Sequence, residues 1–246
     1  MDDNGTPIYI GTSGWTYDHW KGLFYPEKLP KKRWFDYYAA RFRAVEVNAT
    51  FYRAFKDQTY LNWYARAPQG FRYVLKVPRL ITHRKYLQDA DREINEFWRS
   101  ACLLDEKLGA LLLQLHPGIP YNPGLLQSAL LAFGNPNRLV VEFRNKQWLT
   151  AEVHDLLTQL GTAFCSVDSP RDKPLDWVTS EIAYIRLHGR SHWYSHDYSS
   201  QELQEIAHLA IRMVEKGAKT VYIFFNNDFE GYAPKNALTL GEILNP

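Results

Sequence analysis

Eight residues near the carboxyl end of the chain, Val221-Tyr222-Ile223-Phe224-Phe225-Asn226-Asn227-Asp228, carry the clearest indication of the architecture. The first five are aliphatic or aromatic, which is typical of a strand that is covered on both faces in a parallel sheet. Polar residues follow at once, and residues two apart on a strand point to the same face. The pattern therefore predicts a buried strand whose carboxyl end opens onto a polar surface.

The same pattern, an apolar run followed by two polar residues spaced two apart, recurs in other segments of the chain. The polar pairs are Glu46/Asn48, Gln114/His116, Glu142/Arg144, Ser166/Asp168, Arg186/His188 and Asn226/Asp228. Polar groups at the carboxyl ends of many parallel strands are typical of the active-site rim of a (β/α)8 barrel. We therefore expect these side chains to converge around one cavity.

Strand and helix patterns alternate along the chain with short connections, as in an α/β protein. Strands are expected at Pro7–Ser13, Ala44–Asn48, Phe71–Val77, Ala110–Leu115, Leu139–Phe143, Ala163–Val167, Ile182–Leu187 and Thr220–Phe225. Helices are expected at Lys31–Phe42, Gln58–Ala67, Ala90–Leu108, Pro123–Phe133, Ala151–Leu160, Ser200–Lys216 and Lys235–Leu244, with an irregular connection after the sixth strand. An open doubly wound sheet has the same local pattern, but the count of strands favours closure. We predict one TIM-barrel domain over residues 1–246.

Composition narrows the class of partner. The chain has 29 Lys and Arg against 27 Asp and Glu, a balance that argues against bulk electrostatic binding to nucleic acid or membrane. No segment approaches the roughly 20 apolar residues of a membrane span, and the polar start of the chain lacks the form of a signal peptide. Two cysteines are too few for a disulfide framework. We expect a soluble cytoplasmic protein.

Two glutamates and a lysine are the candidates for chemistry at the strand ends. Glu142 follows the apolar run Leu139-Val140-Val141, and Arg144 beside it would favour the ionised carboxylate, which suits a base or a nucleophile. Glu46 is either a catalytic carboxylate or half of a structural ion pair. For Lys76, a charge partner or an anion anchor is favoured over a Schiff-base nucleophile.

The full set of candidates follows from the same reasoning. The candidate catalytic residues are Glu46, Lys76, Glu142, Asp168 and His188, and the candidate ligand-binding residues are Ser13, Trp15, Asn48, Tyr52, His83, Gln114, Arg144, Arg186, Arg190, Tyr194, Asn226 and Asn227. The loop Gly189-Arg190-Ser191 after the seventh strand is suited to phosphate. The aromatic residues Trp15 and Tyr194 are candidates for a stacking wall.

Cofactors and metals are weighed separately. A divalent ion on His83, His188, Glu46, Glu142 and Asp168 is possible. However, the His-x-x-x-His spacings at His188/His192 and His192/His196 fall in a loop rather than on an expected helix and lack the Glu of a zincin motif. No tight carboxylate motif occurs either, so we assign no metal ligand and expect no cofactor.

Ordered motifs along nearly the whole chain resemble one family. They are Gly11-Thr12-Ser13-Gly14-Trp15, Phe24-Tyr25-Pro26, Val45-Glu46-Val47-Asn48, Thr50-Phe51-Tyr52-Arg53, Ile81-Thr82-His83, Leu113-Gln114-Leu115, Val141-Glu142-Phe143-Arg144, Tyr184-Ile185-Arg186-Leu187-His188-Gly189 and Phe225-Asn226-Asn227-Asp228. Together they are similar to the domain-of-unknown-function family 72, also called YecE-like. His116-Pro117 departs from the Pro-Pro that is usual there. The resemblance implies a (β/α)8 barrel and brings no established reaction.

The residues favour an enzyme that acts on a small polar, anionic ligand, such as a phosphorylated or carboxylated sugar-like molecule, at the carboxyl-terminal face of the barrel. Hydrolase, lyase and isomerase chemistry all fit. The alternatives are a metal-dependent phosphodiester hydrolase on nucleic acid and a non-catalytic binding module. If the strand-end charges form an open active site, Glu142→Gln and Arg186→Ala are expected to leave the melting temperature nearly unchanged.

Overall fold

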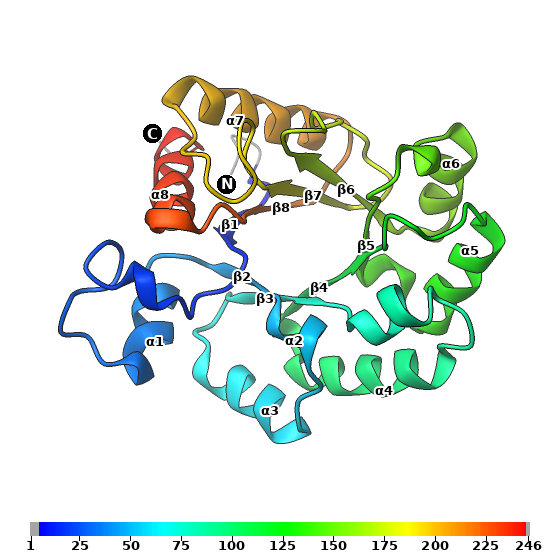
Figure 1. Cartoon of the computed structure of the whole chain (residues 1–246), viewed down its shortest axis with the longest axis horizontal. Helices are drawn as coiled ribbons and strands as arrows, with labels where there is room; N and C mark the ends of the chain where they lie inside the picture. The colour runs from blue at the N-terminus through cyan, green and yellow to red at the C-terminus, as the bar shows by residue number, and fades with distance from the viewer. Residues whose placement is uncertain (1–4, 245–246) are drawn as a thin grey trace.

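The computed structural model describes residues 5–244, which form a ring of parallel strands surrounded by helices (Figure 1). The strands are β1 (Ile8–Thr12), β2 (Ala44–Val47), β3 (Arg72–Lys76), β4 (Leu108–Gln114), β5 (Leu139–Glu142), β6 (Ala163–Asp168), β7 (Ile182–Leu187) and β8 (Thr220–Phe225). The α-helices are α1 (Trp34–Ala39), α2 (Ala49–Tyr52), α3 (Asp57–Arg66), α4 (Asp91–Ala101), α5 (Pro123–Ala132), α6 (Ala151–Leu160), α7 (Ser200–Glu215) and α8 (Tyr232–Leu244). The predicted (β/α)8 TIM barrel is confirmed, including the irregular connection between β6 and β7.

Several element boundaries differ from those expected. The first expected helix is a 3-10 turn, Lys31–Arg33, followed by the short α1. The helix expected to end at Leu108 ends at Ala101 and continues as the 3-10 segment Cys102–Lys107. The four-residue α2, the π-helical turn Leu80–Arg84 and several three-residue 3-10 turns were not predicted, because three to five residues are too few to show a helical period. These 3-10 turns are Asp18–Trp20, Pro136–Arg138, Lys146–Trp148 and Phe229–Gly231.

The seam between β1 and β2 closes the ring. The two strands meet in an isolated parallel bridge between Ser13 and Glu46. A Cβ atom on Gly11 would collide with the carbonyl oxygen of Ala44, so the seam requires glycine there. The hydroxyl of Tyr38 on α1 accepts from the Thr12 N–H at 2.9 Å and donates to the Ala44 oxygen at 3.0 Å. One side chain thus satisfies a backbone group on each strand where direct pairing is lost.

The barrel interior is layered. A buried apolar layer contains residues such as Ala44, Val74, Val140, Tyr184 and Phe224. Two residues further along each of these strands, the inward position is polar: the residues are Glu46, Lys76, Glu142, Arg186 and Asn226. The alternation of strand side chains therefore carries five polar groups to the carboxyl-terminal end of the barrel.

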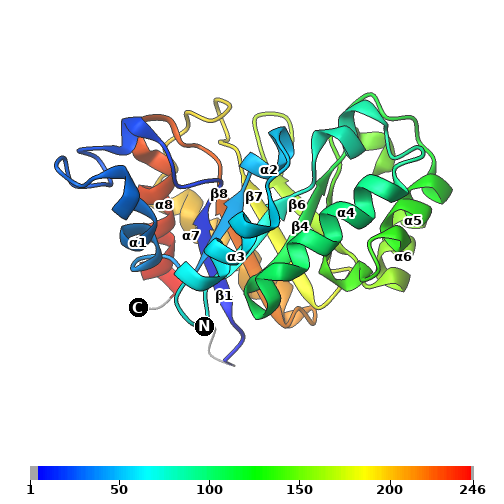
Figure 2. The same ribbon diagram turned by 90° about the horizontal axis from the view of Figure 1, so that it is seen from below.

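Loops gather at that same end. Figure 2 shows the loops after β1 and β7 on one side of the barrel. Hydrogen bonds link these loops to the loop after β8. The Phe229 N–H donates to the carbonyl oxygen of Tyr194 at 3.2 Å, and the Trp20 indole donates to the backbone carbonyl oxygen of Asp228 at 3.0 Å.

Among residues 5–244, no helix has the length and apolar content needed to cross a membrane.

Candidate functional site

A buried ion triad forms the floor of the site. The Arg186 guanidinium lies between two carboxylates, donating to Glu46 at 2.7 and 2.9 Å and also to Glu142. Glu46 and Glu142 are 0% exposed and Arg186 is 1% exposed. Ser13 and Tyr184 each donate a hydroxyl to Glu46 at 2.7 Å. Every charged group of the triad is therefore paired and hydrogen-bonded, as a buried ion must be.

The triad holds both carboxylates ionised. Burial alone would raise the pKa of Glu46, but the charge and hydrogen bonds of Arg186 bring it below the usual value. Burial likewise opposes ionisation of Glu142, whose pKa is held well below its usual range by Arg144 and Arg186. The amide of Gln114 also donates to Glu142, at 2.7 Å. Neither carboxylate is free to act as a proton acceptor for a ligand in this arrangement.

His188 is sealed into the same network as a neutral ring. It is 0% exposed, and burial, reinforced by Arg186, lowers its pKa to about 4. Its Nε2 lies 3.1 Å from a guanidinium nitrogen of Arg144, so Nε2 is an acceptor and the ring proton lies on Nδ1. The Asn226 Nδ2 lies 3.0 Å from Nδ1, and with the proton on Nδ1 the Asn226 amide must be turned over so that its oxygen accepts from Nδ1–H.

Cationic and amide groups form the rim above this floor. The Arg144 side chain is 19% exposed and pairs with Glu142 from the outside. Burial, and then the charge of Arg186, lowers the pKa of Lys76 to about 8. Its ammonium lies 4.3 Å from the ring centroid of Phe51. His83 is half-buried, and burial together with nearby His116, Lys76 and Arg144 lowers its pKa to about 4. The positive charges of Arg186 and Arg144 thus repel that of Lys76 and disfavour its protonated form.

Two further candidates flank the rim. Asn48 directly follows β2, and its Oδ1 is buried with no hydrogen-bond partner among the described residues. A buried acceptor without a partner is a natural contact for a ligand donor or an ordered water. Tyr52, at the end of α2, is 66% exposed and makes an edge contact with Phe51.

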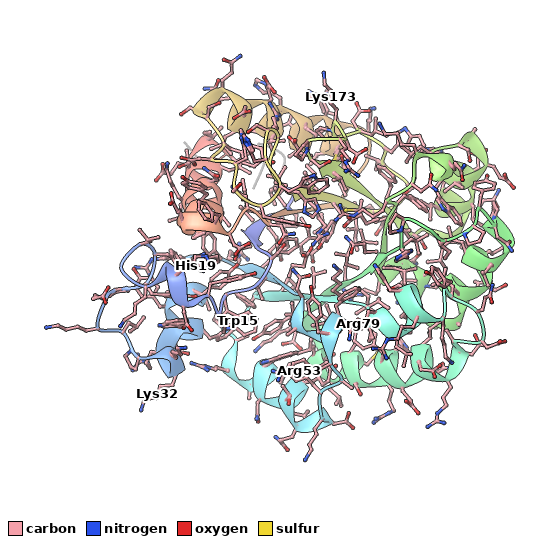
Figure 3. The ribbon with its side chains drawn as sticks, viewed as in Figure 1. Trp15, His19, Lys32, Arg53, Arg79 and Lys173 are labelled. Carbon is pink, nitrogen blue, oxygen red and sulfur yellow. The ribbon has the colours of Figure 1, made fainter. Side chains whose placement is uncertain are left out.

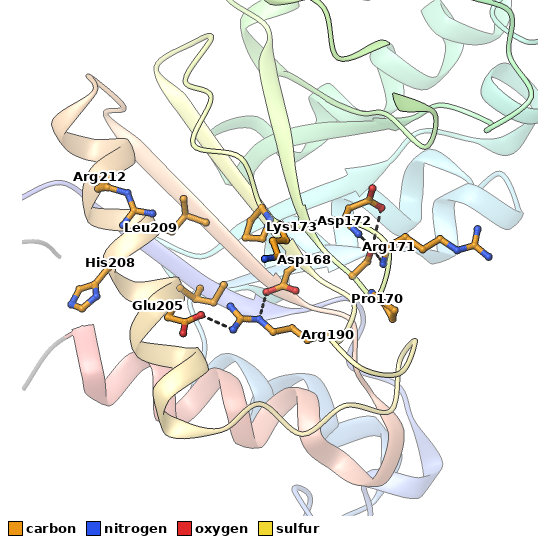
Figure 4. A pocket seen from close by; sticks show the side chains of 13 residues that line it. Asp168, Pro170, Arg171, Asp172, Lys173, Arg190, Glu205, His208, Leu209 and Arg212 are labelled. Carbon is orange, nitrogen blue, oxygen red and sulfur yellow. Dashed lines mark hydrogen bonds and ion pairs between the residues drawn. The ribbon is translucent and has the colours of Figure 1, made fainter. Parts of the chain in front are cut away.

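Asp168 does not join the cluster, so the expectation that it converges with the other strand ends is wrong. On β6 the inward positions are Cys165 and Val167, which places Asp168 on the outer face. There it accepts from Arg190 at 2.8 Å, and Arg190 in turn contacts Glu205 of α7 at 2.6 Å (Figure 4). Arg190 is likewise turned away from the barrel axis, where it lines an outer cavity of about 620 Å³ with Asp168.

Asn227 and Trp15 also lie outside the central cluster. Asn227 is buried, and its amide donates to the His196 oxygen and to Asn236 of α8, so it anchors a loop. Trp15, which is labelled in Figure 3, packs edge-on against Phe35 of α1 and Trp63 of α3. Asn227 is one position past the inward-facing Asn226, and this offset puts its side chain on the helix side. Trp15 lies beyond the end of β1 and follows Gly14, whose φ of 106° breaks the strand alternation.

Tyr194 reaches the cluster through its loop, together with a residue that was not among the candidates. The rings of Tyr194 and Trp193 lie 5.7 and 5.6 Å from the His188 ring. Arg144 lies 5.5 Å from the centroid of Trp193. The second overlooked residue is Tyr184, which shares the inward face of β7 with Arg186. The two-residue spacing between Tyr184 and Arg186 could have shown from the sequence that both side chains point into the barrel.

Within residues 5–244, no three or more His, Cys, Asp or Glu side chains are grouped so that they could hold a metal ion. Glu46 and Glu142 are bound to guanidinium groups, and Asp168 lies on the outer face. The set of metal ligands considered from the sequence therefore does not come together.

Comparison with known proteins gives a family. Residues 9–246 match the family described as "Protein of unknown function DUF72". The chain is 24% identical to UPF0759 protein YunF of Bacillus subtilis (strain 168), over 97% of this chain and 95% of that protein. The crystal structure of a DUF72 family protein from Thermotoga maritima is 29% identical, with a TM-score of 0.87 over 98% of this chain and all of that one. A DUF72 family structure from Enterococcus faecalis, 22% identical with a TM-score of 0.82 over 97% of this chain and 96% of that one, shares the fold.

Proposed function

Since this chain belongs to the DUF72 family, whose name carries no reaction, we propose a function from the site itself: the carboxyl-terminal face of the barrel binds a small ligand through its phosphate or carboxylate group. The observation that carries this proposal is the net charge of the floor and the rim taken together. Two carboxylates face three cations, Lys76, Arg144 and Arg186, while His188 is neutral. One positive charge is therefore left without a partner within the cluster.

The arrangement directs that excess charge toward the ligand. Arg186 is saturated by Glu46 and Glu142 and is sealed from solvent. Lys76, at 8% exposure, and Arg144, whose side chain is 19% exposed, are the more accessible cations of the cluster. An anion between them relieves their mutual repulsion, and the buried surroundings strengthen each charge-assisted hydrogen bond.

Lys76 also gives the site a means of moving a proton. A pKa of about 8 leaves this group mostly protonated at pH 7 but able to exchange its proton near neutrality, which is the range that suits a general acid or base. We assign Lys76 the role of acid toward a ligand oxygen. Gln114 and the free Oδ1 of Asn48 supply neutral hydrogen-bonding groups for orientation.

Sulfate binding tests this proposal, because sulfate is a tetrahedral dianion that does not titrate near neutral pH. Calorimetry at pH 7 is expected to give one site, weakened at least tenfold by Lys76→Met or Arg144→Met. Lys173→Met, which removes an exposed lysine from the outer cavity, is the matched control and is expected to bind as the wild type does. Equal affinity in all four proteins would overturn the proposal.

A non-catalytic binding module and a metal-dependent hydrolase predict different outcomes. The binding module predicts that the wild type binds anions but turns over no phosphorylated or carboxylated sugar. Lys76→Met would then lose affinity but no activity. The hydrolase predicts activity that disappears on chelation and returns with a divalent metal. The proposed enzyme predicts turnover that survives chelation and is lost in Lys76→Met.

A further inference from the structure

A second cavity adjoins the cationic rim. It has a volume of about 500 Å³ and lies between the loops after β1, β7 and β8. Its lining comprises His19, Leu23, Trp193, Tyr194, Ser195, Asp228, Phe229 and Glu230. The volume is within the range of about 300–1,000 Å³ that is usual for small-molecule sites. His19 projects from the 3-10 turn after β1 (Figure 3).

Trp193 joins this cavity to the rim. Its ring lies 5.6 Å from that of His188 and 5.5 Å from the Arg144 guanidinium, and the same residue lines the cavity. A ligand whose anionic group lies at Arg144 therefore extends naturally along Trp193 into the cavity.

The cavity exposes more apolar surface than packing requires. Leu23, Tyr194 and Phe229 are 63%, 45% and 52% exposed. Tyr194 and Glu230 have left-handed backbone conformations, with φ of 64° and 50°, which non-glycine residues seldom adopt. Hydrogen bonds hold the loop in this form, with the Tyr194 N–H donating to the His188 oxygen at 2.7 Å. Strain that is kept in place beside a site is typical of ligand-binding loops.

The polar side chains of the cavity indicate which chemical groups a ligand must carry besides its apolar face. Asp228, whose carboxylate lies 3.6 Å from His19 Nε2, and Glu230, which accepts from the Tyr232 hydroxyl at 2.8 Å, bring carboxylates with remaining acceptor capacity, and burial raises the pKa of Asp228. Carboxylates repel a phosphate but accept hydrogen bonds from hydroxyl groups. Aromatic rings beside carboxylates thus match a molecule with C–H faces and several hydroxyls.

We propose that this cavity receives the sugar ring of a sugar phosphate or sugar carboxylate whose anionic group lies on Lys76 and Arg144. The inference rests on the proposed function, because the rim must first bind the anion. It adds the substrate class: a phosphorylated or carboxylated monosaccharide, with its ring against Trp193 and Phe229 and its hydroxyls donating to Asp228 and Glu230.

Calorimetry with three kinds of probe tests this inference: inorganic phosphate, a panel of hexose and pentose monophosphates, and phenyl phosphate. At least one sugar phosphate is expected to bind tenfold or more tightly than inorganic phosphate. Phe229→Ala and Glu230→Gln are each expected to reduce that preference at least fivefold while leaving phosphate affinity within twofold. Phe229 is half exposed, so its truncation leaves the core intact. Leu131→Ala, on exposed Leu131 of α5, is the control and should change nothing.

The outcomes separate this inference from the proposal on which it rests. If phosphate binds but no sugar phosphate binds more tightly, the inference fails and the anion site stands. If phenyl phosphate binds as tightly as the best sugar phosphate and Glu230→Gln has no effect, the cavity is a general apolar pocket and the inference is again overturned. If phosphate itself does not bind to the wild type, both fail.

Discussion

Replacing Arg186 by methionine removes the cation at the centre of the buried triad. Methionine nearly preserves the volume of the side chain, so the change isolates the charge. It leaves Glu46 and Glu142, both fully buried, facing each other without a cation between them. This burial reverses the expectation from the sequence that Arg186 and Glu142 substitutions leave the melting temperature unchanged.

The size of the effect follows from the burial of the triad. Removing one partner of a buried ion pair costs about 3–5 kcal/mol, because an uncompensated charge stays in the interior. At roughly 2–4 °C per kcal/mol for a chain of this length, the melting temperature falls by about 6–20 °C at pH 7. Arg92→Met is the control: Arg92 pairs with Glu96 on the exposed side of α4, at 83% and 60% exposure, and its loss should cost less than about 0.5 kcal/mol.

The pH dependence gives the sharper signature. In the wild type the folded-state pKa values of Glu46 and Glu142 lie below their unfolded values, so their stabilisation is present above about pH 4.3 and is lost as the pH falls below it. In Arg186→Met the carboxylate of Glu46 loses its guanidinium partner, so burial raises its pKa, whereas Glu142 keeps its ion pair with Arg144. The variant therefore regains stability as the pH falls from 7 toward 5, and the gap to the wild type narrows.

Thermal unfolding followed by circular dichroism at pH 7, 6 and 5 measures this directly. Adding Glu46→Gln to Arg186→Met is expected to recover at least half of the lost stability at pH 7, since Glu142 keeps Arg144 and no buried carboxylate is then left unpaired. A single variant that melts within about 2 °C of the wild type at pH 7, or a gap that does not change with pH, would refute the reasoning.

Three further outcomes follow from other parts of the fold. Gly11→Ala should destabilise the barrel by more than about 2 kcal/mol in urea unfolding, because its Cβ would meet the neighbouring strand β2. Gly241→Ala, in α8, has open space around the new Cβ and should stabilise the protein by about 0.5–1 kcal/mol. Equal effects of the two substitutions would contradict the seam geometry. Tyr38→Phe removes the hydroxyl that serves both seam strands and should cost about 1–3 kcal/mol in the same assay, and no loss would mean that water replaces it. Asp168→Asn should leave sulfate affinity within twofold by calorimetry, because its side chain lies on the outer face; a tenfold loss would return Asp168 to the site.

The strand ends were largely predictable from the sequence. Glu46, Glu142 and Arg186 each stand two residues after a small or apolar inward-facing residue, and the barrel pattern alone brings them together. What the pattern does not contain is their mutual pairing, because a linear sequence does not show which carboxylate an arginine meets across the ring. The functional roles of these residues stay predictions.

The orientation of Asp168 and the position of Trp193 could not be predicted from the sequence. On β6 both faces are buried, so the alternation Cys165-Ser166-Val167-Asp168 is compatible with either face turning inward. Trp193 lies in an irregular loop, and its position depends on the left-handed backbone at Tyr194. Loop conformations of this kind arise from tertiary contacts, which hydrophobic periodicity does not encode.

The most direct test of the anion-binding rim is the proton uptake that accompanies sulfate binding at pH 8. Lys76, with a pKa of about 8, is about half protonated there, and a bound dianion raises its pKa. Calorimetry in two buffers of different ionisation enthalpy should therefore report uptake of up to about half a proton in the wild type and none in Lys76→Met. Sulfate binding without proton uptake in the wild type, or with the same uptake in Lys76→Met, would contradict the account.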